Sequence, residues 1–90
     1  MRRDLAVLVD AGLPAGELEA GVREAAGELL AELLIFDVYR GKGIENGLKS
    51  IAFGLILQDY SRTLTEQDIE GVVDGVTDHL QKKFGASLRD

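Results

Sequence analysis

The hydrophobic positions of the chain follow two different periods. Residues 5–9 form a short apolar and β-branched run that ends in Asp10-Ala11-Gly12, which predicts a largely buried strand followed by a turn. From Pro14 onward the apolar residues recur every three or four positions, a spacing typical of one face of a helix. The apolar stripe of this predicted first helix is Leu18, Val22, Ala25, Ala26, Leu29, Leu30 and Leu33.

Two further strand-like runs, residues 35–40 and 49–58, flank the glycine-rich segment 41–47, an arrangement that favours a long hairpin. Thr65-Glu66-Gln67-Asp68 is typical of a capping box and predicts the start of a second helix, which Gly85 ends. Residues 86–90 are predicted to add a short edge strand. The apolar stripe of the second helix is Ile69, Val72, Val73, Val76, Leu80 and Phe84.

The predicted order of elements is β-α-β-β-α-β. It indicates an α+β, ferredoxin-like sandwich in which both helices cover one face of a four-stranded antiparallel sheet and the other face is open. Ninety residues suffice for one such core, so we expect a single domain over residues 1–90.

Composition narrows the possible chemistry. The chain has no cysteine and one histidine, His79, so disulfides and thiolate metal sites are excluded and we expect no metal site; His79 is predicted to be a solvated helix residue. Apolar runs stay far below the roughly 20 residues of a membrane span, and the N-terminal run is too short for a secretory signal. We therefore expect a cytoplasmic protein, and the Met1 start suggests an excised piece of a longer subunit.

The distribution of charge matters more than its total. The formal net charge is −6, which is unfavourable for binding nucleic acid because phosphates are met mainly by Lys and Arg. The acidic residues are concentrated in the two helical stretches, whereas residues 36–50 carry three cations against two acids. If RNA is bound, the hairpin is the expected place, with the acidic helices facing away.

Strand alternation sorts the side chains of the hairpin by face. Ile51, Phe53, Leu55 and Leu57 are predicted to lie under the helices, with Phe36 and Val38 beside them in the preceding strand. The residues predicted to face outward are Ile35, Asp37, Tyr39, Ser50, Ala52, Gly54 and Ile56. Among these, Asp37, Tyr39 and Ser50 converge near the 41–47 loop.

This outward group suits single-stranded RNA. Tyr39 offers a ring for base stacking, and Asp37 and Ser50 can form hydrogen bonds to base edges or to a ribose hydroxyl. Three cations at the rim of the hairpin, Arg40, Lys42 and Lys49, are candidates for phosphate contacts. The same residue types are also common on any half-solvated sheet, so the pattern alone leaves ordinary cross-strand packing open.

Two other functions fit the predicted fold. A ferredoxin-like protein-interaction or structural module would use the outward apolar residues Ile35, Ala52 and Ile56 as its interface. An acylphosphatase-like hydrolase shares the order of elements, but it needs a cation in the loop after the first strand, and here that loop is Asp10-Ala11-Gly12-Leu13-Pro14.

Several separate motifs, in order and at matching spacing, resemble one known family. They are Arg3-Asp4-Leu5-Ala6, the run from Phe36 to Gly43, Gly47, Lys49-Ser50, Ala52-Phe53, Gln58-Asp59, Arg62-Thr63-Leu64-Thr65, Phe84-Gly85-Ala86 and Leu88-Arg89. The chain is thereby similar, over essentially its whole length, to the ferredoxin-fold anticodon-binding domain that closes the β subunit of bacterial phenylalanyl-tRNA synthetases.

The resemblance implies a binding role. It implies that Asp37, Tyr39 and Ser50 face the anticodon of tRNA-Phe, and that the partners are this tRNA, the remainder of the β subunit and the catalytic α subunit. Aminoacylation, with its ATP and magnesium, would take place elsewhere in that enzyme, so this domain is expected to have no catalytic residue and no cofactor. Gly54 and Ile56 stand where relatives often have polar or cationic residues, which suggests that recognition is confined to the hairpin end.

Overall fold

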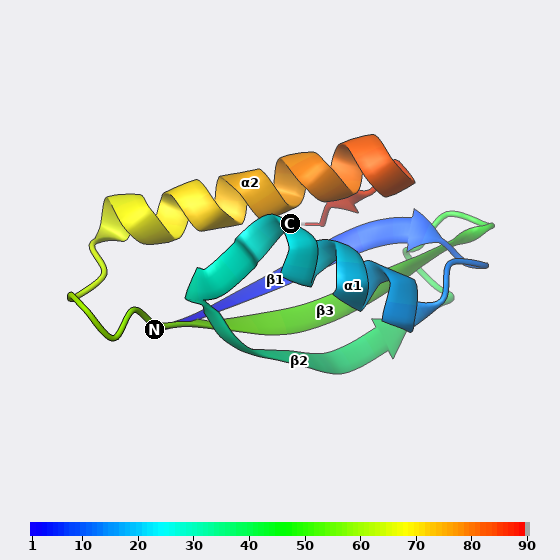
Figure 1. The fold of residues 1–90 in the computed structure, drawn as a ribbon. Coiled ribbons are helices and arrows are strands. Elements are labelled where there is room, and N and C mark those ends of the chain that lie inside the picture. The colour runs from blue at the N-terminus through cyan, green and yellow to red at the C-terminus, as the bar shows by residue number, and fades with distance from the viewer. Residues whose placement is uncertain (90) are drawn as a thin grey trace.

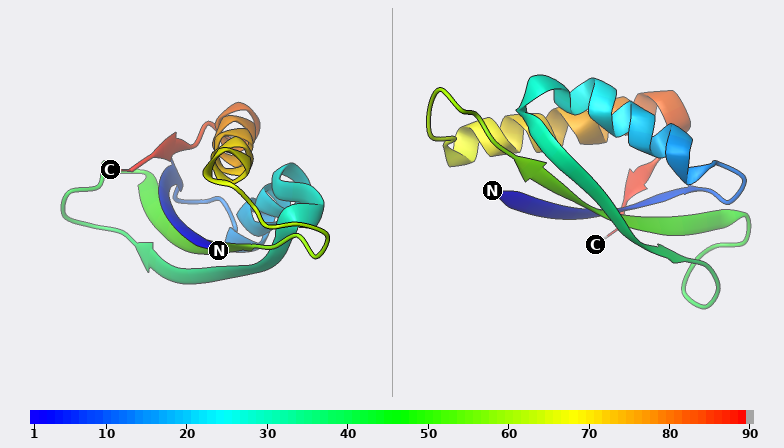
Figure 2. Two further views of the ribbon diagram at one scale, coloured as in Figure 1. Left: turned by 90° about the vertical axis from the view of Figure 1, so that its left-hand side faces the viewer. Right: turned by 60° about the horizontal axis from the view of Figure 1, so that its bottom comes forward.

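The computed structural model describes residues 1–89 and contains a four-stranded sheet with two helices. In chain order the elements are β1 (Arg2–Asp10), α1 (Ala15–Ala26), a 3-10 turn η1 (Gly27–Leu29), β2 (Leu30–Tyr39), β3 (Leu48–Leu57), α2 (Glu66–Phe84) and β4 (Ser87–Leu88). The strand order is β2-β3-β1-β4 with antiparallel neighbours. Both helices lie on the same side of the sheet (Figures 1 and 2). The predicted ferredoxin-like fold is confirmed.

Strand β3 is central, and its alternation forms the middle of the core. Ile51, Phe53 and Leu55 are completely buried and Leu57 is nearly so, as the parity of the strand predicts. The helices cover these residues with a matching set of fully buried side chains, Leu18 and Val22 from α1 and Ile69, Val76 and Leu80 from α2.

The first helix is shorter than its apolar pattern predicts. Gly27 has a φ of 66°, a conformation that L-residues rarely adopt, and the helix ends before it. The prediction that Leu29, Leu30 and Leu33 belong to this helix is therefore wrong. Leu29 lies in η1, and the other two begin β2, where Leu33 is buried in the core. The run from Leu29 to Phe36 is almost continuously apolar, so it fits a strand as well as a helix.

The second helix begins and ends where the sequence predicts. Thr65 Oγ1 accepts a hydrogen bond from the Asp68 amide at 3.2 Å, and the Asp68 carboxylate accepts one from the Thr65 amide at 2.9 Å, which completes the capping box. Gly85, in the left-handed conformation, provides the C-terminal cap. No helix within residues 1–89 is long and apolar enough to cross a membrane.

The two helices pack closely because of a glycine. A Cβ atom on Gly21 of α1 would lie 2.8 Å from Cε2 of Phe84 in α2, so only glycine leaves room for this ring. His79 is part of the same contact: its Nε2 atom is buried, 3.8 Å from Glu24 Oε2, and has no hydrogen-bond partner among the described residues. The histidine predicted to be solvated is therefore partly covered: its side chain is 31% exposed, and Nε2 is buried where α1 packs against α2.

The packing of the core predicts that two phenylalanines contribute very differently to the free energy of unfolding. Replacing the fully buried Phe53 with alanine leaves a cavity and should destabilise the chain by about 3–5 kcal/mol, measured by urea unfolding. The matched control is Phe36→Ala, at a side chain that is 54% exposed, for which we expect a loss of at most about 1 kcal/mol. Equal losses at the two positions would contradict the packing described here.

Candidate nucleic-acid interface on the open face of the sheet

A β-bulge in β2 decides which side chains reach the open face, defined here as the face of the sheet opposite the helices. The pairing passes from Ile35 opposite Phe53 directly to Asp37 opposite Ala52, which makes Phe36 the inserted residue. Ile35 therefore shares the helix-covered face with Phe53 and packs against the core, whereas Phe36 is exposed. The predicted faces of these two residues are wrong, because simple alternation does not count an inserted residue.

Past the bulge, the predicted alternation returns. Val38 lies opposite the buried Ile51 but is itself 45% exposed, so its predicted burial under the helices is wrong; it lies near the hairpin end of an edge strand. Asp37 and Tyr39 lie opposite Ala52 and Ser50 on the open face. The structure thus brings Asp37, Tyr39 and Ser50 together at the hairpin end of this face, as predicted. Asp37 is exposed and Tyr39 is 37% exposed, but Ser50 is only 3% exposed.

Arg89, which was not selected from the sequence, reaches the open face from the other edge of the sheet. Its amide donates to the Ala6 carbonyl at 2.8 Å on the β4 side of the sheet, and its guanidinium carbon lies 5.6 Å from the centroid of the Tyr39 ring on β2. The side chain therefore crosses the open face above β1 and β3, where Ser50 lies between Tyr39 and Leu8. A strand of two residues gives too short a pattern for its facing to be predicted.

The hairpin loop is anchored at several points. The Tyr39 hydroxyl donates to the Lys42 carbonyl at 2.7 Å, and the Ala11 amide donates to the Gly47 carbonyl at 2.8 Å. Arg40 Nη2 donates to the Ala11 carbonyl at 3.4 Å, and its side chain remains exposed, as does that of Lys42. Both cations are therefore at the rim of the open face, as the sequence predicts.

Lys49 is not at this rim. It lies opposite Val9, on the helix-covered face of β3, and only 5% of the residue is exposed. The predicted position at an exposed edge is wrong because Lys49 has the same parity as Ile51 and Phe53 in β3, so strand alternation turns it toward the helix-covered face. Its aliphatic stem is covered by the fold.

The loop after β1 is unsuited to a phosphate. The Gly12 amide, which would have to donate to an anion, already donates to Asp10 Oδ1 at 2.8 Å. Glu17 lines the same shallow depression, so two carboxylates would repel a bound phosphate. This arrangement disfavours the acylphosphatase-like alternative.

The apolar surface differs from the one predicted for a protein-interaction module. Ile35 belongs to the core, and Ala52 and Ile56 are half-buried on the open face. Leu34 and Phe36, on β2, are instead the exposed apolar residues of this region, at 37% and 54%.

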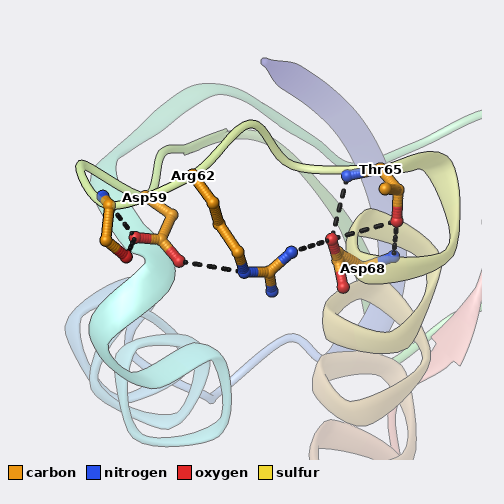
Figure 3. A network of polar contacts seen from close by, with 5 residues as sticks. Asp59, Arg62, Thr65 and Asp68 are labelled. Carbon is orange, nitrogen blue, oxygen red and sulfur yellow. Dashed lines mark hydrogen bonds and ion pairs between the residues drawn. The ribbon is translucent and has the colours of Figure 1, made fainter.

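Arg62 is held in a polar network at the far end of the sheet (Figure 3). Its Nη1 donates to Asp68 Oδ2 at 2.6 Å, and its Nε lies 3.5 Å from Asp59 Oδ2. Arg62 thus links the two ends of the turn before α2. Hydrogen bonds from Arg62, and then from the amide and hydroxyl of Thr65, hold the pKa of the Asp68 carboxyl well below its usual 3.8. Hydrogen bonds from Ser61 likewise lower the pKa of Asp59.

Within residues 1–89, no group of three or more histidine or acidic side chains is arranged to hold a metal ion. The side chains of the open face can stack, form hydrogen bonds and form ion pairs.

Comparison with known proteins identifies relatives of the whole described chain. The family model described as "Ferredoxin-fold anticodon binding domain" matches residues 1–89. Phenylalanine–tRNA ligase beta subunits from Vibrio vulnificus, Vibrio cholerae and Haemophilus influenzae are 49%, 46% and 44% identical over 89 residues, which cover 99% of this chain. The chain spans only 11% of the length of these relatives.

The polar network predicts how stability depends on pH. Because the pKa of Asp68 is depressed in the folded state, its stabilising contribution is present above the unfolded value of 3.8 and is lost as the pH falls toward the folded value. We expect Asp68→Asn to lower the midpoint of thermal unfolding at neutral pH, and this deficit to shrink on acidification below about pH 4. Asp74→Asn, in the same helix, is the control for the change in net charge. A deficit of Asp68→Asn that stays constant with pH would contradict the proposed network.

Proposed function

This chain belongs to the ferredoxin-fold anticodon binding domain family, and we propose on that basis that its open face binds the anticodon arm of tRNA-Phe. The observation that carries the proposal is the meeting of Asp37, Tyr39 and Ser50 at the hairpin end of that face. Strand alternation and the family resemblance both point to these three residues. They come from β2 and β3, which pair so that Tyr39 lies opposite Ser50.

Each of the three side chains has a distinct role in the proposal. The Tyr39 ring stacks on an unpaired base, and its hydrogen bond to the Lys42 carbonyl fixes the orientation of the ring before RNA arrives. The exposed Asp37 carboxylate accepts hydrogen bonds from a donor edge such as that of guanine. The Ser50 hydroxyl, covered in the free protein, becomes available to a base or ribose when the Arg89 side chain moves aside.

Phosphate contacts come from the rim of the hairpin. Arg40 and Lys42 are exposed there, and the acidic residues of α1 and α2 lie on the other side of the sheet, where they repel RNA least. With a net charge of −6 and few rim cations, the isolated chain is expected to bind weakly. Specificity then depends on the base contacts rather than on the phosphates.

The role in a larger enzyme is also a proposal, since the chain matches 11% of its relatives' length. We propose that the domain works as part of a phenylalanine–tRNA ligase beta subunit in the cytoplasm, with the rest of that subunit and the α subunit as partners. The domain itself holds the tRNA, and ATP, magnesium and the aminoacylation chemistry belong to the catalytic α subunit.

The first test is a titration of the chain, followed by NMR, with an anticodon stem-loop of tRNA-Phe at low salt. We expect shifts concentrated at Asp37, Tyr39, Ser50 and the 40–47 loop, and a weaker response to an unrelated stem-loop. Tyr39→Leu should weaken binding by roughly 1–3 kcal/mol, the usual value of one stacked base. Tyr60→Leu, at an aromatic residue that is 89% exposed on a distant loop, is the matched control.

A spectrum that does not change at millimolar chain, or equal and scattered shifts with both RNAs, would contradict anticodon binding. Equal losses for Tyr39→Leu and Tyr60→Leu would show that the open face is not the binding surface.

The rim cations predict a specific dependence on salt. Each phosphate contact to single-stranded RNA contributes about −0.7 to the slope of log K against log salt. The double variant Arg40→Gln, Lys42→Gln should therefore reduce the magnitude of the slope by about 1.4. Lys82→Gln, Lys83→Gln, at the end of α2 on the helix side, should leave the slope unchanged. The same change in both double variants would indicate that RNA contacts the chain nonspecifically.

A further inference from the structure

A second pair of arginine and aromatic residues lies on the open face, separate from the Arg89–Tyr39 pair. The guanidinium carbon of Arg2, in β1, is 5.7 Å from the centroid of the Phe36 ring on β2. Phe36 is the inserted residue of the bulge and remains 54% exposed beside the guanidinium. The insertion turns this ring away from the core, where simple alternation would have placed it, and onto the open face.

Gly54 makes this arrangement possible. It lies on β3 between Asp4 of β1 and Leu34 of β2, and a Cβ atom there would be 2.9 Å from Asp4 Oδ1 and 3.0 Å from Arg2 Nε. The missing side chain leaves a channel through which Arg2 crosses the central strand to reach Phe36. Asp4 Oδ1 accepts from Arg2 Nε at 2.8 Å and holds the guanidinium in this channel.

From the sequence, Gly54 was expected to limit the RNA-binding surface rather than to extend it. A glycine where relatives often carry a polar or cationic residue indicated that recognition stops at the hairpin end. In the structure the cation is present all the same, supplied by the neighbouring strand across the glycine. The open face therefore has two places where a planar cation lies beside an exposed ring.

We propose that Phe36 and Arg2 form a second stacking site for a base of single-stranded RNA, next to the site at Tyr39. The proposal rests on the proposed function and extends it along the sheet. A base stacks on the exposed Phe36 ring, and the Arg2 guanidinium, which is planar and charged, contacts the same base or its phosphate.

The positions of Phe36 and Tyr39 along β2 bear on which RNA bases the two rings bind. Phe36 and Tyr39 are three residues apart on β2, a span of at most roughly 10 Å at about 3.3 Å per residue, which the bulge shortens. Each ring has its own guanidinium beside it, Arg2 at Phe36 and Arg89 at Tyr39. In the proposal the two sites therefore take bases of different nucleotides from one RNA loop. The charged pair of Arg2 and Asp4 in the middle of the face favours RNA over a purely apolar protein contact.

The test compares Phe36→Leu with wild type and with Tyr60→Leu, using fluorescence anisotropy and a labelled anticodon stem-loop of tRNA-Phe. Phe36→Leu should weaken binding about fivefold, at the low end for loss of one stacked base, while Tyr60→Leu should bind as wild type does. A series of stem-loops, each lacking one loop base, then locates the contact. Phe36→Leu should have no effect on the one stem-loop that lacks its base, and Tyr39→Leu should have no effect on a different one.

A direct measurement keeps the test valid if Phe36→Leu is unstable. In the wild-type chain, the ring protons of Phe36 should shift upfield on addition of the same stem-loop, because a stacked base shields them. The absence of such a shift while the Tyr39 ring responds would overturn the second site.

The outcomes separate this inference from the proposed function. Binding that depends on Tyr39 but not on Phe36 overturns the second site and leaves anticodon binding intact. No binding by the wild-type chain overturns both. If Phe36→Leu leaves RNA binding unchanged and instead abolishes a concentration-dependent dimer, the exposed ring is a protein contact and the second site is wrong.

Discussion

The alternating burial of β3 is the constraint on which the rest of the structure depends. Every second residue from Ile51 to Leu57 is completely or almost completely buried beneath the helices, and a shift of one position would bring these large apolar side chains to the solvent. The strand is paired on both sides, with β1 and with β2. Its register therefore fixes the register of its neighbours, and with it the residues of the open face. The binding surface is positioned by the core on the opposite side of the same strands.

A helix or strand could be predicted from the sequence where its hydrophobic pattern fits only one type of secondary structure and where its ends have clear capping residues. Helix α2 has a capping box at one end, a glycine at the other and a clean apolar stripe between them, so its bounds could be predicted. The strands β1 and β3 were predicted from their apolar runs, although β1 begins at Arg2, three residues before the predicted start. The junction of α1 and β2 could not be predicted, since its almost continuous apolar sequence satisfies both periods and only the left-handed Gly27 separates them.

The candidate site shows the same distinction. Asp37, Tyr39 and Ser50 were predicted together because the alternation holds between the bulge and the hairpin loop. Ile35 and Phe36 were assigned to the wrong faces because a bulge adds a residue without leaving a mark in the sequence. Arg2 and Arg89 were not selected because their side chains reach across other strands, and a contact of that kind depends on sheet order and on the small size of Gly54. Strand alternation predicts on which face a side chain lies, but it does not predict how far a long side chain extends across neighbouring strands.

The bulge at Phe36 also bears on the solubility of the domain. Strand β2 is ten residues long and forms an edge of the sheet, and such an edge, when flat and apolar, is a template for pairing with a second copy of the same chain. An inserted residue twists the strand locally and interrupts the regular spacing of its outer amides and carbonyls. The irregularity that presents an aromatic ring on the open face thus also protects the edge against aggregation. A variant that removed this bulge by deleting one residue would lose the exposed ring and the irregularity in the middle of the edge together.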